Sequence, residues 1–281
     1  MGDHPLLEPL LAAIAARRAA RPGRMVVAGL CGAQGSGKTT LAAALTARLE
    51  AGGTRAATLS LDDLYHTRAE RQALARRVHP LFVTRGVPGT HDVALGLATL
   101  AALDRGEAAP LPLFDKATDD RVPAAQWPHA PAPLAVLVLE GWCLGARPQA
   151  AAALADPVNP LERVEDADAI WRSHANRALA GDYQHLFARI DLLALLAAPD
   201  FAVVARWRDQ AEQALRQRGA PGAMDKTAIA RFVQHYERLT RHILAEMPDR
   251  ADLVAWLDAN RQVVGQGRTE TRSSANFGSG T

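Results

Sequence analysis

The stretch "GLCGAQGSGKTTL", residues 29–41, decides how the rest of the chain is interpreted. It follows the apolar run "MVVAGL" and precedes "LAAALTARLE", so we expect a glycine-rich loop between a strand and a helix. Within this stretch, Gly32, Gly37, Lys38 and Thr39 match the spacing G-x-x-x-x-G-K-[ST]. That spacing is typical of a loop that cradles the phosphates of a nucleotide.

Glycine suits such a loop because successive backbone N–H groups can turn inward without a Cβ in the way, at a helix N-terminus whose dipole favours an anion. We expect Lys38 to reach the terminal phosphates, the Thr39 hydroxyl to hold Mg²⁺, and Thr40 to contact the α-phosphate. The predicted nucleotide-binding residues are Gly32, Ala33, Gln34, Gly35, Ser36, Gly37, Lys38, Thr39 and Thr40.

Composition narrows the class of protein. The 281 residues are 48% hydrophobic, which is enough for a full core. The 32 basic and 30 acidic residues nearly cancel and form no basic stripe, so no nucleic-acid partner is indicated. Cys31 and Cys143 abut apolar runs and are expected to be buried thiols. Residues 4–20 fit a helix better than a signal peptide or a membrane span, so we expect a cytoplasmic protein with no membrane partner.

Five short, nearly continuous apolar runs alternate with helical stretches, the pattern of a parallel sheet covered on both faces. They are "MVVAGL" (25–30), "AATLSL" (56–61), "LAVLVLE" (134–140), "LLALLA" (192–197) and "LVAWL" (253–257). We predict one α/β domain over residues 1–265, with a five-stranded parallel core sheet and helices on both faces. An acceptor-binding segment is expected at about 80–133, a helical lid at about 200–220, and a disordered tail at 266–281.

Acidic residues end two of these runs, where ligands bind in an open parallel sheet. Asp62 and Asp63 follow the second run, and one of them could accept the proton of a substrate hydroxyl while the other caps a helix. Glu140 closes the third run in the Walker B arrangement, where it would help Thr39 to hold Mg²⁺. The alternative for Glu140 is an ordinary polar strand end.

Two loops mix cations with carboxylates and are predicted to bind the phosphate acceptor. They are "TRGVPGTHD" and "PLFDKATDDRVP". A carboxylate on the acceptor would suit the planar fork of an arginine. The alternatives are that Asp92 caps the helix running to Asp104 and that the second loop is merely solvated. The candidate acceptor-binding residues are Asp62, Tyr65, Arg85, His91, Asp92, Asp115, Lys116 and Arg121.

Four arginines follow the fourth apolar run, at positions 206, 208, 216 and 218. At about 100° per residue they do not share one helix face, so they form no basic stripe. One or two of them could close over the phosphates as an arginine finger supplied by the same chain.

Taken in order, "SLDDLY", "RGVPGTHD", "PLFDKATDDRVP", "LVLEGWCLG" and "WRDQAEQALR" resemble the D-glycerate 3-kinases of the plant and fungal type. These are P-loop kinases related to phosphoribulokinase, uridine kinase and pantothenate kinase, and the resemblance covers roughly residues 25–265. It implies that Asp62 is the catalytic base, that Glu140 is the Walker B acid and that Arg208 is the lid arginine. Asp115 matches the aspartate of the uridine kinase "YDF" segment, although this chain has "FDK" there.

The expected activity is therefore transfer of the γ-phosphoryl group of MgATP to D-glycerate, with Lys38, Asp62, Glu140 and Arg208 as the catalytic residues. A kinase for uridine, pantothenate or another hydroxy acid is the first alternative. A non-catalytic nucleotide-dependent switch is the second, although paired acids argue against it because a switch has no acceptor to activate. The sequence does not indicate an oligomeric state.

Overall fold

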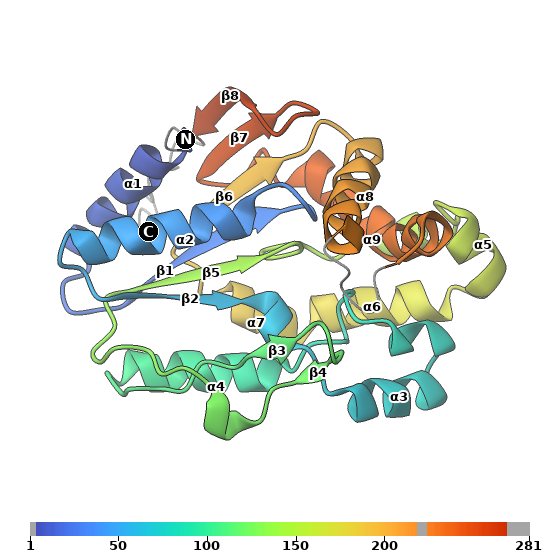
Figure 1. Ribbon diagram of the computed structural model, residues 1–281, viewed down its shortest axis with the longest axis horizontal. Coiled ribbons are helices and arrows are strands. Elements are labelled where there is room, and N and C mark those ends of the chain that lie inside the picture. The colour runs from blue at the N-terminus through green and yellow to red at the C-terminus, as the bar shows by residue number, and fades with distance from the viewer. Residues whose placement is uncertain (1–3, 218–223, 269–281) are drawn as a thin grey trace, which may run out of the picture.

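A six-stranded sheet forms the centre of the molecule, in the order β2-β5-β1-β6-β7-β8 (Figure 1). The structure is a computed structural model that describes residues 4–217 and 224–268. The strands are β1 (Val26–Gly32), β2 (Ala56–Ser60), β5 (Val136–Gly141), β6 (Leu192–Ala197), β7 (Leu253–Leu257) and β8 (Val263–Arg268). All pair in parallel except β8, which is antiparallel to β7. The predicted five-stranded parallel core is confirmed, and β8 adds an edge strand.

Helices cover both faces of this sheet, as the apolar runs predict. The helices are α1 (Leu7–Ala20), α2 (Lys38–Ala51), α3 (Arg68–Arg77), α4 (Val93–Asp104), α5 (Pro160–Glu165), α6 (Ile170–Ala180), α7 (Asp182–Phe187), α8 (Phe201–Gln217) and α9 (Lys226–Glu246). Helices α1, α2 and α8 share one core with the sheet, while α4 and α7 share the core on the other face. Alternate residues of each strand enter the two cores: Val27 lies in one and Ala28 in the other.

The order of the strands places a crevice at the carboxyl end of β1. From β1 the chain crosses to β2 on one side, and later strands β6 and β7 lie on the other side, so β1 marks a topological switch point. In Figure 1 the arrowheads of the parallel strands point toward the side where α8 and α9 lie, and the short β3–β4 hairpin lies below the end of β2. The hairpin pairs β3 (Phe114–Asp115) with β4 (Asp120–Arg121).

Two expectations about the periphery need correction. The first helix begins at Leu7 and not at residue 4. The predicted tail starts too early, because residues 266–268 belong to β8, where Gly265 and Gly267 lie against the ring of Trp256. The rest of that predicted tail, 269–281, lies outside the described residues. The predicted acceptor-binding segment, about 80–133, contains α4 and the β3–β4 hairpin.

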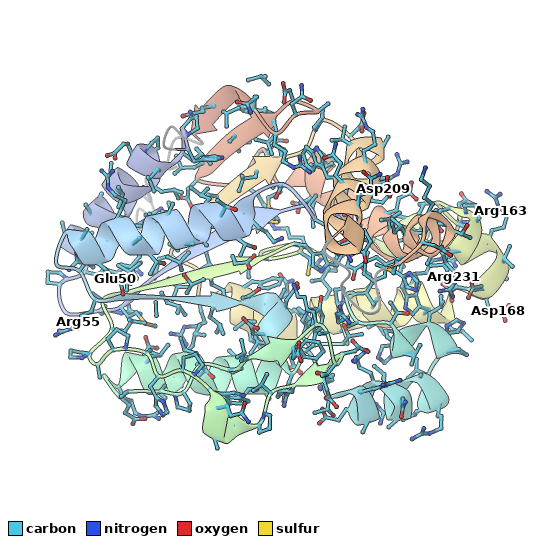
Figure 2. All side chains as sticks on the ribbon, in the orientation of Figure 1. Glu50, Arg55, Arg163, Asp168, Asp209 and Arg231 are labelled. Atoms are coloured by element: carbon cyan, nitrogen blue, oxygen red, sulfur yellow. The ribbon has the colours of Figure 1, made fainter. Side chains whose placement is uncertain are left out.

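Charged side chains of both signs lie at opposite ends of the molecule (Figure 2). Glu50 and Arg55 are at the end where α2 finishes, while Arg163, Asp168 and Arg231 surround α5. Arg231 makes a two-bond ion pair with Glu165. No described helix is long and apolar enough to cross a lipid bilayer.

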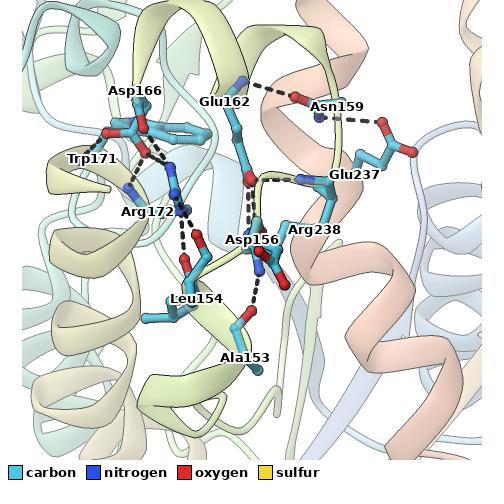
Figure 3. A network of polar contacts seen from close by, with 12 residues as sticks. Ala153, Leu154, Asp156, Asn159, Glu162, Asp166, Trp171, Arg172, Glu237 and Arg238 are labelled. Atoms are coloured by element: carbon cyan, nitrogen blue, oxygen red, sulfur yellow. Dashed lines mark hydrogen bonds and ion pairs between the residues drawn. The ribbon is translucent and has the colours of Figure 1, made fainter. Parts of the chain in front are cut away.

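Two buried ion pairs hold the segment that links β5 to α5 (Figure 3). Arg172 pairs with Asp166 and donates to the carbonyls of residues 154 and 155. Arg238 of α9 pairs with Glu162 and donates to the carbonyls of residues 153 and 156. Four consecutive carbonyls are therefore held by two arginines, each neutralised by a buried carboxylate, which fixes α9 relative to the loops around β5.

Candidate active site

The glycine-rich loop adopts the geometry that its sequence predicts. It connects β1 to α2, and Gly35 and Gly37 have φ angles of +78° and +94°, which favour glycine. A Cβ on Gly35 would lie 2.7 Å from the Cβ of Trp207, so α8 packs directly behind the loop. A Cβ on Gly37 would meet no atom within 4 Å, which leaves open space at the start of α2.

Glu140 lies beside this loop at the end of β5. Its Oε1 accepts a hydrogen bond from the Thr39 hydroxyl at 3.1 Å, and its Oε2 lies 3.9 Å from Lys38 Nζ. Glu140 is 4% exposed, and its Oε2 has no hydrogen-bond partner in the described structure. The predicted grouping of Lys38, Thr39 and Glu140 is therefore present in space.

Asp62 lies on a 3₁₀ helix (Leu61–Leu64) that directly follows β2. Its Oδ1 accepts from the Tyr65 hydroxyl at 3.0 Å, and its Oδ2 accepts from Lys116 Nζ at 2.7 Å. Burial alone would raise the pKa of Asp62, but the charges of Lys116 and Lys38 outweigh burial and hold this pKa well below its usual range. Asp62 is thus ionised and close to the predicted phosphate site.

Asp63 faces a different neighbour. Its Oδ1 accepts from the backbone N–H of Phe114 at 3.1 Å and so anchors the β3–β4 hairpin. Burial raises its pKa to about 6. The two neighbouring acids thus have different partners, because they diverge on the 3₁₀ turn: Asp62 contacts Tyr65 and Lys116, and Asp63 contacts the hairpin backbone.

The β3–β4 hairpin carries three of the predicted acceptor residues. Asp115 is used inside the turn, where its carboxylate accepts from the Ala117 N–H and the Thr118 hydroxyl. Lys116, at the exposed tip, reaches back to Asp62. The structure thus brings Lys116 to the site and gives Asp115 a turn-stabilising position instead.

Arg121 and Asp92 join the hairpin to the first acceptor loop. Arg121 donates through Nε and Nη2 to the carbonyl of Tyr65, and its Nη2 lies 3.3 Å from Asp92 Oδ2. The other oxygen of Asp92 accepts from Leu95 N–H and caps α4, so the capping alternative is correct for that oxygen. Both residues hold the loops around Tyr65 in place.

Arg85 is also paired. Its guanidinium contacts the carboxylate of Asp119 and lies 5.6 Å from the centre of the Phe114 ring. The buried Arg71 shares Asp119 with it at 2.9 Å. The side chain of Arg85 is 23% exposed, so its guanidinium is partly accessible beside the hairpin.

Two stacked rings form the wall behind Asp62. Tyr65 stacks on His91 with 4.4 Å between ring centres and 23° between ring planes, and His91 Nδ1 is 2.6 Å from the hydroxyl of Tyr183. Burial lowers the pKa of His91 to about 3, so its ring is neutral at pH 7. His91 Nε2 is buried without a hydrogen-bond partner.

Arg208 faces α9 and Arg206 is exposed, so the expectation that they lie on different sides of α8 is confirmed. The guanidinium of Arg208 lies 5.3 Å from the Phe232 ring centre and donates to Glu212 at 2.6 Å. Glu212 is 2% exposed. The side chain of Arg216 and the whole of residue 218 lie outside the described structure.

Buried polar atoms without partners concentrate at these residues. In the described part of the chain nine buried side-chain N or O atoms lack a hydrogen-bond partner, and five belong to predicted site residues. Those five are Gln34 Oε1, Ser36 Oγ, His91 Nε2, Glu140 Oε2 and Arg208 Nε. Because buried polar groups are normally paired, this concentration indicates a place where a polar ligand binds.

Several residues that shape the site have no recognisable signal in the sequence. Tyr236 of α9 donates to the carbonyl of Arg85, and Trp142 donates to that of Gly86. A Cβ on Gly86 would lie 2.3 Å from the Tyr236 hydroxyl, so the glycine in "TRGVPGTHD" permits that contact. Glu212 is also missed, because an acid four residues after an arginine resembles an ordinary surface helix pair.

The fold and this loop define a P-loop kinase of the α/β class. The model of the phosphoribulokinase / uridine kinase family matches residues 27–178, and the chain belongs to that family.

Individual relatives agree with this assignment. The chain is 37% identical over 225 residues to the uncharacterized kinase mug58 of Schizosaccharomyces pombe, covering 76% of this chain and 79% of that protein. It is 33% identical over 241 residues to the chloroplastic D-glycerate 3-kinase of Arabidopsis thaliana, covering 81% of this chain but only half of that longer protein. The structure of D-glycerate 3-kinase from Cryptococcus neoformans superposes with a TM-score of 0.79 at 26% identity, covering 94% of this chain and 99% of that one.

Proposed function

We propose that this kinase phosphorylates D-glycerate to 3-phosphoglycerate at the expense of ATP. The observation that carries the proposal is the contact between Asp62 and Lys116 beside the phosphate-binding loop. A carboxylate that can receive a hydroxyl proton and an ammonium that can bind a carboxylate stand next to each other there, which suits a small hydroxy acid. The similarity to two D-glycerate 3-kinases supports the same acceptor.

The proposed phosphoryl transfer assigns separate roles to the residues of the candidate active site. The loop amides and Lys38 hold the phosphates of ATP, and Arg208 stabilises the charge that develops on the transferred group. Asp62 orients the acceptor hydroxyl and takes its proton as the hydroxyl oxygen bonds to the γ-phosphorus. The bond from that phosphorus to the bridging oxygen breaks, and ADP leaves. Because the transition state is mostly dissociative, positioning and charge stabilisation contribute more than the strength of the base.

A divalent cation fits the pair formed by Thr39 and Glu140. The buried Glu140 Oε2 has no hydrogen-bond partner, and a hydroxyl with a carboxylate is the oxygen donor set that Mg²⁺ uses together with phosphates and water. No group of three or more His, Cys, Asp or Glu side chains within the described residues could form a metal centre by itself. When bound, Mg²⁺ would neutralise the charge of the β- and γ-phosphates.

Neighbouring residues would bind the rest of the acceptor. The neutral His91 can offer Nε2 to an oxygen of the substrate. Arg85 is partly exposed and would add positive charge near the carboxylate. Tyr65, Asp92 and Arg121 would act as positioning residues, because their contacts hold the wall and the loops around Asp62.

The test is an ADP-release screen with D-glycerate, L-glycerate, uridine, pantothenate and ribulose 5-phosphate as acceptors. We expect the highest kcat/KM with D-glycerate. Lys38→Ala is the control and should lose nearly all turnover while its melting temperature stays close to that of the wild type. Phosphorylation of uridine with D-glycerate ignored would refute the proposed acceptor, and ATP consumption that no acceptor stimulates would favour a nucleotide-dependent switch.

A further inference from the structure

Lys116 is one of three lysines in a chain that contains 29 arginines, the others being Lys38 and Lys226. Lys38 lies 3.9 Å from Glu140 and Lys116 lies 2.7 Å from Asp62, so two of the three lysines face the two acids of the candidate active site. Arginine is the usual cation of this chain. A lysine at 116 therefore indicates that the position uses a property that arginine lacks.

Two arginines next to the hairpin, Arg71 and Arg121, are each fixed by several hydrogen bonds. Arg121 donates twice to one carbonyl and pairs with Asp92, and Arg71 donates to the carbonyls of residues 66, 83 and 119. Lys116 has Asp62 as its hydrogen-bond partner within the described residues, and its side chain is 60% exposed. An ammonium on a flexible stem of four carbons can change partner without movement of the backbone, whereas a multiply bonded guanidinium cannot.

Asp62 is engaged on both oxygens, by partners of unequal mobility. Tyr65, on Oδ1, is 2% exposed, and its ring is packed between His91 and Phe114. Lys116, on Oδ2, stands at the exposed hairpin tip. In this masked state each oxygen of Asp62 already accepts one hydrogen bond, and the charge of Lys116 lowers the basicity of the carboxylate toward an acceptor hydroxyl. Lys116 is the partner that can leave.

We propose that Lys116 determines specificity by exchanging Asp62 for the carboxylate of the acceptor, so that an acidic acceptor unmasks its own base. The inference rests on the proposed function, in which Asp62 receives the acceptor hydroxyl. A hydroxy acid brings the anion that can replace Asp62 beside the ammonium. A neutral alcohol brings none, so Lys116 stays on Asp62 and the hydroxyl is not activated. The exchange changes ionic partners and forms or breaks no covalent bond.

Kinetics with D-glycerate and glycerol test the exchange, because glycerol keeps the three-carbon skeleton without the charge. Lys116→Met should lower kcat/KM for D-glycerate by at least about tenfold, since it removes a charged partner of the carboxylate. The same variant should raise turnover of glycerol, because Asp62 is no longer masked. Lys226→Met is the matched control: Lys226 is exposed at the start of α9, and its loss should change neither value.

The pH dependence of glycerol turnover is a second test of the exchange. Only Lys116 changes in the variant, while the other titratable groups that interact with Asp62 stay the same; these are Lys38, Asp63, Tyr65, His91, Cys143 and Tyr236. The acidic limb for glycerol should therefore move to higher pH in Lys116→Met. If glycerol turnover and its acidic limb are unchanged, Lys116 merely binds a carboxylate and the exchange is wrong. An equal fall in kcat/KM for both acceptors, together with a lower melting temperature, would show that Lys116 is structural. That result would also refute the exchange.

A measurement that needs no turnover separates this inference from the proposed function. Protein labelled with ¹⁵N-lysine should give three ammonium signals, and Lys116→Met assigns one of them. With ADP present, D-glycerate should shift that signal and glycerol should not. If another acid proves to be the substrate and shifts it, the proposed acceptor fails and the exchange stands. If D-glycerate is phosphorylated while the signal stays and Lys116→Met keeps the preference for glycerate over glycerol, the exchange fails and the proposed function stands. A neutral natural acceptor refutes both.

Discussion

Replacing Arg208 with alanine should affect catalysis and stability in ways that can be separated. In the proposed mechanism its guanidinium acts mainly when charge spreads over the transferred phosphoryl group. Its loss should lower kcat by a factor on the order of 10³, equivalent to about 4 kcal/mol, with little change in the Kd of MgATP.

The same change leaves Glu212 without its cation. Glu212 is 2% exposed, and breaking a buried ion pair typically costs roughly 3–5 kcal/mol. The cost should be smaller here, about 1–3 kcal/mol, because Arg208 is 27% exposed and Glu212 still accepts from the N–H of Met224. Arg208→Ala should therefore be destabilised as well as slow, and the single variant cannot show which role matters for turnover.

Adding Glu212→Gln to Arg208→Ala separates the catalytic role of Arg208 from its structural role. The double variant removes the unpaired carboxylate, so its melting temperature should recover while kcat remains low. Arg206→Ala, two residues away on the exposed side of α8, should match the wild type in both measurements. Lysine at 208 should rescue kcat only partly, because it lacks the planar fork. Recovery of kcat together with stability in the double variant would show that Arg208 is structural and would refute the lid assignment.

Three further predictions concern the ranking of Asp62 and Asp63 in catalysis, the effect of Asp63 on stability at different pH, and the packing at Gly86. Asp62→Asn should lower kcat by roughly 10²–10⁴ in a steady-state assay, whereas Asp63→Asn should cost much less; a reversed ranking would move the base to Asp63. Burial raises the pKa of Asp63 to about 6 from an ordinary value near 4, so folding binds a proton between these values and stability falls as pH rises through them. Asp63→Asn keeps an oxygen for the Phe114 N–H and should therefore raise the melting temperature more at pH 8 than at pH 5. Gly86→Ala places a Cβ 2.3 Å from the Tyr236 hydroxyl and should lose roughly 2–4 kcal/mol in urea denaturation, whereas Gly53→Ala, with φ +75° and open space, should lose only about 1 kcal/mol; equal losses would show that the Tyr236 contact is unimportant.

The fold was predictable because its determinants are local. The five parallel strands are short runs of buried apolar residues, and the spacing from Gly32 to Thr39 specifies the loop after β1. The sixth strand was not predictable, since "VVGQGR" has no continuous apolar character and pairs with β7 through its backbone. The hairpin was missed for a similar reason, because its strands are two residues long and Asp63 anchors one of them from a distant part of the chain.

The members of the candidate site were easier to predict than their partners. Residue type and position at a strand end singled out Asp62 and Glu140. No pattern in the sequence says that Arg85 contacts Asp119, that Arg121 donates to a backbone carbonyl, or that Lys116 reaches Asp62 across 54 positions. Such pairings depend on how loops fold back over the sheet, and loop residues carry no periodicity from which that path could be deduced.

The backbone around the acceptor site and the cations that would meet the substrates differ in how firmly they are held, and this difference bears on catalysis. On the acceptor side, Tyr236 and Trp142 donate to the carbonyls of residues 85 and 86. Arg238 donates to the carbonyl of residue 153 and so fixes α9, which carries Tyr236. Two of the cations predicted to meet charge on the substrates, Lys116 and Arg208, each have a single carboxylate partner within the described residues. Both partners are anions, so an incoming carboxylate or phosphoryl group competes with them directly. Substrate binding can then move the side chains of Lys116 and Arg208 while the residues that orient the acceptor hydroxyl stay in place. Phosphoryl transfer depends on accurate positioning of the acceptor, and this arrangement preserves it.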